Sequence, residues 1–298
     1  MKILITGAKG QLGTELQRVL ESKKCEIGPI DEIYKDSECL ALSSKDLDIS
    51  DFSKTKEIIT INKPDILINC SAFTDVDACE TEKELSIKVN ALGPKNLAII
   101  CSNLDIKLIH ISTDYVFDGN NSEPYCEWDV CNPKTMYGKS KFLGEQYVKD
   151  FSRKYFILRT SWLCSAFGKN FVKTIIDLAS KREEINVVND QFGNPTSAND
   201  LVYHILKLAV TNNYGIYHCS GEGVCSWYDF AKKIIEYSKF PTKIVPVTTE
   251  NFQKINFRAA HRPKNSALEN LMLNAIGLNK MRSWEESFKD IVNSFCRK

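Results

Sequence analysis

The chain of 298 residues carries 39 Lys and Arg against 38 Asp and Glu, which gives a net charge of +1. This balance argues against a nucleic-acid partner, and no apolar run reaches the length of a membrane span. The chain starts directly with a predicted strand instead of an apolar leader, so we expect a cytoplasmic protein. Its 11 cysteines are scattered without Cys-x-x-Cys pairs, and we therefore expect neither a disulfide framework nor a bound metal.

The start of the chain predicts a nucleotide site. Residues 3–5 form an apolar run typical of a strand buried on both faces of a parallel sheet, and a helical apolar repeat begins at Leu12. Between them lie Gly7, Gly10 and Gly13, where the backbone can approach a pyrophosphate and the helix N-terminus supplies free amides. We expect this turn to bind a dinucleotide cofactor through Gly7, Lys9, Gly10, Gln11, Leu12 and Gly13.

The strand that follows the first helix has two candidates. Residues 25–30 form a segment that ends at Asp31, and residues 38–42 form another that ends at residues 43–45, Ser-Ser-Lys. An acid at this strand end binds the ribose 2′-hydroxyl of NAD, whereas Ser and Lys suit the 2′-phosphate of NADP. The residues alone leave both alternatives open.

Further along the chain, apolar strands alternate with helical segments. Strands are predicted at 66–70, 107–111 and 155–158, and helices at 51–62, at 80–103 with a bend at residues 93–94, and at 135–148. This alternation predicts an α/β fold, a Rossmann-type doubly wound parallel sheet.

Beyond Trp162 the pattern loosens. Helices are expected at 170–181, 198–210 and 226–238, and short strands at 185–188, 215–219 and 243–247. We expect a nucleotide-binding domain at 1–162 and a smaller, mixed α/β substrate-binding domain at 163–298, with some later segments returning to the first sheet.

Candidate reactive residues follow the predicted strand at 107–111. Residues 112–114, Ser-Thr-Asp, lie at its carboxyl end, where open α/β sheets bind their ligands. After a long polar loop, Tyr137 and Lys141 share one face of the next helix. Because a nearby ammonium favours the phenolate, we expect Lys141 to lower the pKa of Tyr137 and make it a proton donor near neutral pH.

The Tyr-x-x-x-Lys spacing is not specific by itself. It occurs at Tyr137/Lys141, Tyr203/Lys207 and Tyr228/Lys232. Only the first pair follows a nucleotide-binding half, a hydroxyl-bearing strand end and a loop. We therefore expect Tyr137 to be catalytic and the other two tyrosines to be structural.

Longer stretches carry a resemblance to a known family. The glycine turn, Thr113 and the Tyr137/Lys141 pair are similar to those of extended short-chain dehydrogenases/reductases. Four further stretches resemble the dTDP-4-dehydrorhamnose reductases: STDYVFDG (112–119), RTSW (159–162), NDQFGNPT (189–196) and RPKNS (262–266). This similarity runs from Met1 to about Trp284.

The resemblance implies reduction of the C4 ketone of dTDP-4-dehydro-β-L-rhamnose by NAD(P)H. On this reading Tyr137 donates a proton to the developing alkoxide, and Thr113, together with Ser112, holds the oxygen. Lys141 positions the nicotinamide ribose. The catalytic residues implied are therefore Thr113, Tyr137 and Lys141.

The resemblance also favours residues 38–42 as the second strand, because residues 47–49 match a Leu-Asp-Ile segment of the family. Residues 43–45 then face the 2′ position, which favours NADPH, with NADH as the alternative. The further cofactor contacts implied are Ser43, Ser44, Asp48, Ile49, Ser71, Ala72 and Phe73.

The implied partner is a nucleotide-sugar substrate. Its expected contacts are Ser112, Thr113, Asp114, Trp162, Asn170, Gln191 and Arg262. For three of them a structural role is the alternative: a core position for Trp162, a helix cap for Asn170 and a surface ion pair for Arg262. Glu15 matches a position that supports magnesium-dependent dimerisation in some relatives, but we assign no metal and expect a monomer or a homodimer.

Two rival functions remain. One is another reductase or epimerase of nucleotide sugars on the same fold. The other is a non-catalytic regulatory relative, such as the regulatory subunit of methionine adenosyltransferase. Retention of Thr113, Tyr137 and Lys141 favours an active enzyme over the second rival.

Overall fold

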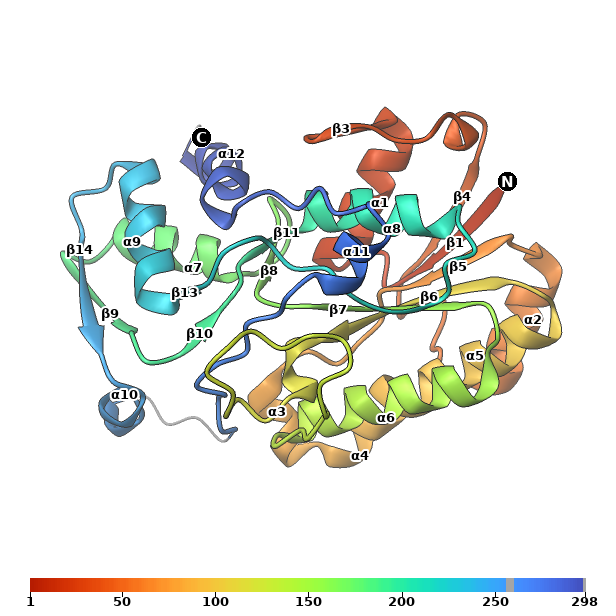
Figure 1. Ribbon diagram of the computed structural model, residues 1–298, viewed down its shortest axis with the longest axis horizontal. Coiled ribbons are helices and arrows are strands. Elements are labelled where there is room, and N and C mark those ends of the chain that lie inside the picture. Colours follow the sequence, from red (N-terminus) through yellow and green to blue (C-terminus); the bar gives the residue numbers. More distant parts are fainter. Residues whose placement is uncertain (256–259, 297–298) are drawn as a thin grey trace.

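The computed structural model describes residues 1–255 and 260–296 and contains a six-stranded parallel sheet with helices on both faces (Figure 1). In spatial order its strands are β12 (Gly215–His218), β7 (Tyr155–Thr160), β6 (Lys107–Thr113), β5 (Ile66–Asn69), β1 (Lys2–Thr6) and β4 (Glu38–Leu42). The strand order reverses direction between β1 and β5, which creates a crevice at the carboxyl ends of these strands. The predicted doubly wound sheet is confirmed.

Alternate residues of β1 supply the cores on the two faces of the sheet. Ile3 and Ile5 pack with one pair of helices, and Leu4 packs with a second set. The first face is covered by α1 (Gln11–Ser22) and α8 (Ala198–Ala209), and the second by α2 (Phe52–Asn62), α5 (Gly93–Asn103) and α6 (Met136–Phe151).

The second strand of the sheet is β4, as the family resemblance favours. Its residues pair in register with β1, from Lys2 with Glu38 to Thr6 with Leu42. The rival segment instead forms a two-stranded antiparallel hairpin, β2 (Lys24–Cys25) with β3 (Gly28–Pro29), outside the main sheet. The chain therefore reaches Ser43 at the strand end beside the glycine turn.

The long helical stretch predicted at 80–103 is divided. It comprises α3 (Val76–Thr81), α4 (Lys83–Ile87), a π-helical turn (Lys88–Leu92) and α5. The π-helical turn ends directly before residues 93–94, where the bend was expected, and it interrupts the regular α-helical hydrogen bonding there.

The remaining elements form a smaller lobe, at the left of Figure 1, around its own apolar core. Its helices are α7 (Phe171–Ala179), α9 (Trp227–Ser238), α10 (Thr249–Ile255) and α12 (Trp284–Cys296), and α11 (Leu271–Ala275) lies against β12. Its short strand pairs are β8 (Leu163–Cys164) with β11 (Thr196–Ser197), β10 (Phe192–Gly193) with β13 (Cys225–Ser226), and β9 (Glu184–Val188) with β14 (Lys243–Val247). None of the helices in the described ranges is long and apolar enough to cross a bilayer.

Candidate active site

A cavity of about 570 Å³ opens at the carboxyl ends of the central strands. This size suits a small-molecule ligand. The cavity brings together the glycine turn, the end of β6 and the start of α6, which are far apart in the sequence. The predicted residues on its walls are Lys9, Gly10, Gln11, Leu12, Gly13, Ala72, Ser112, Thr113, Asp114, Tyr137, Lys141 and Trp162.

The glycine turn is shaped by close backbone contacts. Gly7 has a φ of +69°, and a Cβ built on it would lie 2.7 Å from backbone atoms of Cys70 and Ser71. A Cβ on Gly13 would collide with the carbonyl oxygen of Gly7, while the amide of Gly10 donates to that oxygen at 2.9 Å. Only glycine permits this approach of the turn to β5, which leaves the N-terminus of α1 open toward the cavity.

The start of α6 positions Tyr137 and Lys141. The Thr135 hydroxyl accepts a hydrogen bond from the Gly138 amide at 3.0 Å and caps the helix. Tyr137 and Lys141 then fall one helical turn apart on the side that faces β6. Lys141 is 2 % exposed, and its ammonium donates to the Ile111 carbonyl at 2.5 Å.

Thr113 forms the other side of this group. Its hydroxyl donates to Asp114 Oδ1 at 2.8 Å and accepts from the Tyr115 amide at 3.2 Å. The Tyr115 ring packs edge-on against the Tyr137 ring, with 5.6 Å between the ring centroids. The two hydroxyls that the sequence assigns to the reacting oxygen, those of Thr113 and Tyr137, thus lie on the same cavity wall.

The electrostatics at Tyr137 differ from our expectation. Burial raises the pKa of Tyr137 above its ordinary value, and hydrogen bonding with Thr113 opposes this only in part. Burial also lowers the pKa of Lys141 to about 8, and its ammonium is directed at the Ile111 carbonyl. Lys141 is not among the groups that shift the Tyr137 pKa, so the expectation that it lowers this pKa is wrong, and Tyr137 carries the proton that it must donate.

Ser112 is held by a buried ion pair. Its hydroxyl donates to Glu145 Oε1 at 2.5 Å, and Glu145 pairs with Arg159 through Arg159 Nη2 at 2.8 Å. Glu145 and Arg159 were not among the sequence-predicted residues. The signal was present in part, since Arg159 opens the RTSW stretch and Glu145 lies one helical turn beyond Lys141.

The residues expected around the cofactor ribose lie beside the cavity rather than on its walls. The Ser43 amide and hydroxyl both donate to Asp46 Oδ2, at 2.9 and 2.6 Å, whereas Ser44 is exposed. Asp48 accepts from the Ser50 hydroxyl at 2.6 Å. The Ile49 side chain is buried in the core under the sheet, so the structure does not bring that side chain toward the cavity.

The segment after β5 is fixed by Asn90, which lies in the π-helical turn. Asn90 Oδ1 accepts from the Phe73 amide at 2.8 Å, and Asn90 Nδ2 donates to the Phe73 carbonyl at 3.0 Å. The Ser71 amide donates to Asn69 Oδ1 at 3.1 Å. These bonds set the backbone on either side of Ala72, which lines the cavity.

Trp162 lines the cavity as part of an aromatic pair. It stacks on Trp227, with ring centroids 3.5 Å apart and planes at 7°, and its backbone is left-handed with a φ of +46°. A Cβ on Gly193 would lie 2.5 Å from the Trp162 ring. Trp227 was missed in the sequence, because only tertiary packing brings α9 against Trp162 in the link between β7 and β8.

Asn170 caps a helix. Its Oδ1 accepts from the Lys173 amide at 3.0 Å at the start of α7, and its Nδ2 donates to Gln11 Oε1 at 3.0 Å. The structure does not bring Asn170 to the cavity walls. Glu15 is also built into the fold, because its side chain is 4 % exposed and accepts a hydrogen bond from Asn199 Nδ2 at 2.5 Å.

Gln191 and Arg262 line a smaller neighbouring cavity of about 290 Å³, which shares Tyr115 and Trp227 with the larger one. Arg262 makes a two-pronged ion pair with Asp77, at 3.1 and 2.7 Å. Gln191 Nε2 donates to the Thr249 hydroxyl at 2.9 Å. Arg262 thus forms an ion pair, which was the structural alternative for this residue. The pair is not a surface pair, because the Arg262 side chain is only 15 % exposed.

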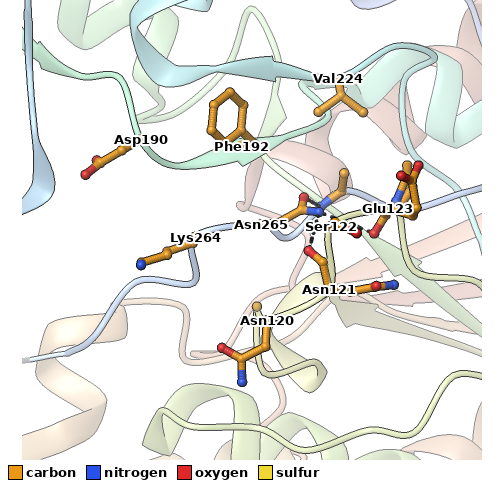
Figure 2. Close-up of a pocket in the computed structure, with 12 residues that line it drawn as sticks. Asn120, Asn121, Ser122, Glu123, Asp190, Phe192, Val224, Lys264 and Asn265 are labelled. Carbon is orange, nitrogen blue, oxygen red and sulfur yellow. Dashed lines mark hydrogen bonds between the residues drawn. The ribbon is translucent and has the colours of Figure 1, made fainter.

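A third cavity, of about 730 Å³, lies beside the loop that follows β6. Figure 2 shows Phe192 and Val224 across from Asn120 and Asn121. Asn265 Nδ2 donates to the carbonyls of Asn121 and Glu123, at 2.9 and 3.3 Å. None of the predicted site residues lines this cavity, whereas most of them line the cavity at the glycine turn.

The sheet, the glycine turn and the Thr113, Tyr137 and Lys141 group together define an extended short-chain dehydrogenase/reductase. The model of the RmlD substrate binding domain family matches residues 1–297. The spore coat polysaccharide biosynthesis protein SpsK of Bacillus subtilis is 38 % identical over 98 % of this chain and 96 % of its own.

Solved structures agree with this match. A dTDP-4-dehydrorhamnose reductase from Clostridium acetobutylicum has a TM-score of 0.92 and 43 % identity, with 99 % of each chain covered. A dTDP-4-dehydrorhamnose reductase from Bacillus anthracis, in complex with NADP, has a TM-score of 0.90 and 42 % identity over 100 % of this chain and 99 % of its own. The chain belongs to the RmlD family, the family of these dTDP-4-dehydrorhamnose reductases.

Proposed function

We propose that this protein reduces the C4 ketone of dTDP-4-dehydro-β-L-rhamnose to dTDP-β-L-rhamnose with NADPH, as a step in the synthesis of cell-surface polysaccharide. The observation that carries the proposal is the meeting of Thr113 and Tyr137 with the glycine turn in one cavity. A dinucleotide site and a proton donor beside it are the two requirements of ketone reduction. The names of the full-length relatives support the choice of substrate.

The glycine turn fits the cofactor. The space that a Cβ would fill at Gly7 and Gly13 is taken up by close backbone packing, and the amides at the start of α1 suit a pyrophosphate. NADPH is favoured over NADH because Ser44 and Lys45 are exposed at the end of β4, where a 2′-phosphate would meet them. When bound, the reduced nicotinamide supplies the hydride.

In the reaction the Tyr137 hydroxyl gives its proton to the oxygen on C4. The Thr113 hydroxyl donates a hydrogen bond to the same oxygen as negative charge develops there. Lys141 binds the ribose hydroxyls and holds the cofactor against this wall. These three residues are the proposed catalytic group.

The substrate contacts proposed are Ser112, Thr113, Asp114, Trp162, Gln191 and Arg262. Trp162 forms an apolar wall for the deoxysugar, and Arg262 binds the diphosphate, for which a guanidinium fork is well suited. The Asp77 carboxylate pairs with the same Arg262 guanidinium, so the diphosphate has to compete with Asp77 for it. For Asn170 and for the side chain of Ile49, the contacts described above favour structural roles.

The division at residues 1–162 and 163–298 is part of the proposal, with the later part supplying most of the substrate site. The two parts are not separate in space, because β12 is a strand of the main sheet and α8 packs against one face of that sheet. We further propose that the protein works in the cytoplasm, where nucleotide sugars are made, as a monomer or a homodimer.

The test is an absorbance assay of NADPH oxidation with dTDP-4-dehydrorhamnose. Tyr137→Phe should lower kcat by about 10²–10⁴, the range for loss of a general acid. Tyr203→Phe is the matched control, since Tyr203 also precedes a lysine by four residues but lies in α8, and it should retain wild-type turnover. Full activity of Tyr137→Phe would rule out the proposed proton donor. Binding of NADPH without turnover of any nucleotide sugar would favour a regulatory protein.

A further inference from the structure

The loop between β8 and α7 extends from the smaller lobe to the cavity at the glycine turn. Gly168 and Lys169 of this loop line that cavity, and the Lys169 side chain is exposed. Neither residue was among the sequence-predicted site residues, although Asn170 directly follows them. The wall of the proposed cofactor site is therefore built in part by the smaller lobe.

Gln11, at the start of α1, ties this loop to the glycine turn. Its Oε1 accepts from the Ser165 amide at 3.1 Å and from Asn170 Nδ2 at 3.0 Å. Asn170 Nδ2 also donates to the Ser165 carbonyl at 2.8 Å. At Gly168, which has a φ of +69°, a Cβ would lie 3.1 Å from Gln11 Cγ. The Gln11 side chain thus holds the loop beside the turn, and with it the backbone that carries Lys169.

The charges on the cavity walls suit an anionic ligand. Among the described residues, the cationic side chains on these walls are Lys9, Lys141 and Lys169, against the single acidic side chain of Asp114. The Lys141 ammonium donates to the Ile111 carbonyl. The Lys169 ammonium, by contrast, makes no hydrogen bond or ion pair within residues 1–255 and 260–296. Its donors are therefore available to a bound anion.

We propose that Lys169 binds the pyrophosphate of the dinucleotide cofactor, together with the amides at the start of α1. The amides supply directional hydrogen bonds, and the ammonium supplies a compact charge on a flexible stem. The cofactor is favoured over the substrate's diphosphate because the loop is anchored on Gln11, within the glycine turn. Arg262, the proposed diphosphate contact, lines the neighbouring cavity instead. This role rests on the proposed NADPH site.

Fluorescence titration of the whole protein with NADPH tests the proposal without turnover. Lys169→Gln should weaken NADPH binding by about tenfold, the loss expected when one charge-assisted hydrogen bond is removed. Lys169→Arg keeps the charge and should bind NADPH within about threefold of wild type. Lys173→Gln is the matched control, because Lys173 lies four residues further on, is exposed and does not line the cavity. It should match wild type.

Calorimetric titration with dTDP separates the two anions that the protein is proposed to bind. Lys169→Gln should bind dTDP within about twofold of wild type, since distant sites act independently. A loss of dTDP affinity with unchanged NADPH affinity would overturn the proposal and assign Lys169 to the substrate. Unchanged NADPH affinity alone, or equal losses for both ligands, would overturn it as well. Failure of the proposed function is distinguishable, because wild-type protein would then bind no NADPH.

Discussion

Glu145 and Arg159 form an ion pair within the sheet-facing side of α6, with side chains that are 0 % and 3 % exposed. Arg159 Nη2 and Nε approach the two carboxylate oxygens at 2.8 and 3.0 Å. Glu145 also accepts from Ser112, the residue before Thr113. The pair therefore connects the packing of α6 to the end of β6, where the proposed reaction takes place.

Loss of one partner from this pair should be severe. Glu145→Gln leaves the Arg159 charge buried without its counterion, which typically costs about 3–5 kcal/mol of unfolding free energy. Urea denaturation measures this change. Asp105→Asn breaks the exposed Lys154–Asp105 pair and should cost less than about 1 kcal/mol. Similar losses in the two variants would show that burial does not govern the strength of the pair.

Substitution of Gly7 and Gly277 by alanine separates the cost of a left-handed backbone from the cost of a steric collision. Both glycines have a φ of +69°, but only at Gly7 would a Cβ meet other atoms. Gly277→Ala meets no atom within 4 Å and should cost about 1 kcal/mol, the price of a left-handed alanine. Gly7→Ala adds a collision with the backbone of Cys70 and Ser71. It should therefore lower stability further and weaken NADPH binding by at least about tenfold, as measured by fluorescence titration. Unchanged NADPH affinity in Gly7→Ala would contradict the assignment of the turn to the cofactor.

Signals carried by neighbouring residues were readable in the sequence. The glycine turn can be predicted from the spacing of three glycines between a strand and a helix. The start of α6 can be predicted from Thr135 and the residues that follow it. The choice of β4 over the hairpin at residues 24–29 was different. It depends on pairing with β1, so the residues left it open until a family resemblance was added.

Features that depend on distant contacts were missed or misjudged. The stack of Trp162 on Trp227 and the pair of Asp77 with Arg262 join residues that have no shared local pattern. The pKa of Tyr137 was misjudged because the four-residue spacing predicts that Lys141 lies near Tyr137. The spacing does not predict which group the Lys141 ammonium binds, and in the structure this is the Ile111 carbonyl. Burial and hydrogen-bond direction arise only after the chain has folded.

Removal of the Trp162 side chain should weaken substrate binding selectively. Trp162→Ala takes away the apolar wall that we assign to the deoxysugar, so the substrate KM should rise by about tenfold or more. NADPH affinity should stay within about twofold, because the glycine turn is untouched. Steady-state kinetics with each ligand varied in turn measure both effects. Trp128→Ala, at a ring position that is 68 % exposed, serves as the control, and a rise in KM there would undermine the assignment.

Asp114 should make stability depend on pH. Its folded pKa of about 6 lies above the value near 3.9 expected in the unfolded chain. Wild-type stability therefore loses a contribution as pH rises from about 4 to about 6, which amounts to roughly 3 kcal/mol at 1.36 kcal/mol per unit. Asp114→Asn removes this loss. The stability of the variant relative to wild type should increase between pH 4 and pH 7 in urea denaturation, and a constant difference would contradict the raised pKa.

The most direct test of the central claim is the stoichiometry of reduction. Wild-type protein is mixed with dTDP-4-dehydrorhamnose and either NADPH or NADH, and coenzyme oxidation is followed together with product formation by chromatography and NMR. We predict one dTDP-β-L-rhamnose formed for each NADPH oxidised, with NADH used less efficiently. Consumption of neither coenzyme, or formation of a different sugar, would contradict the account.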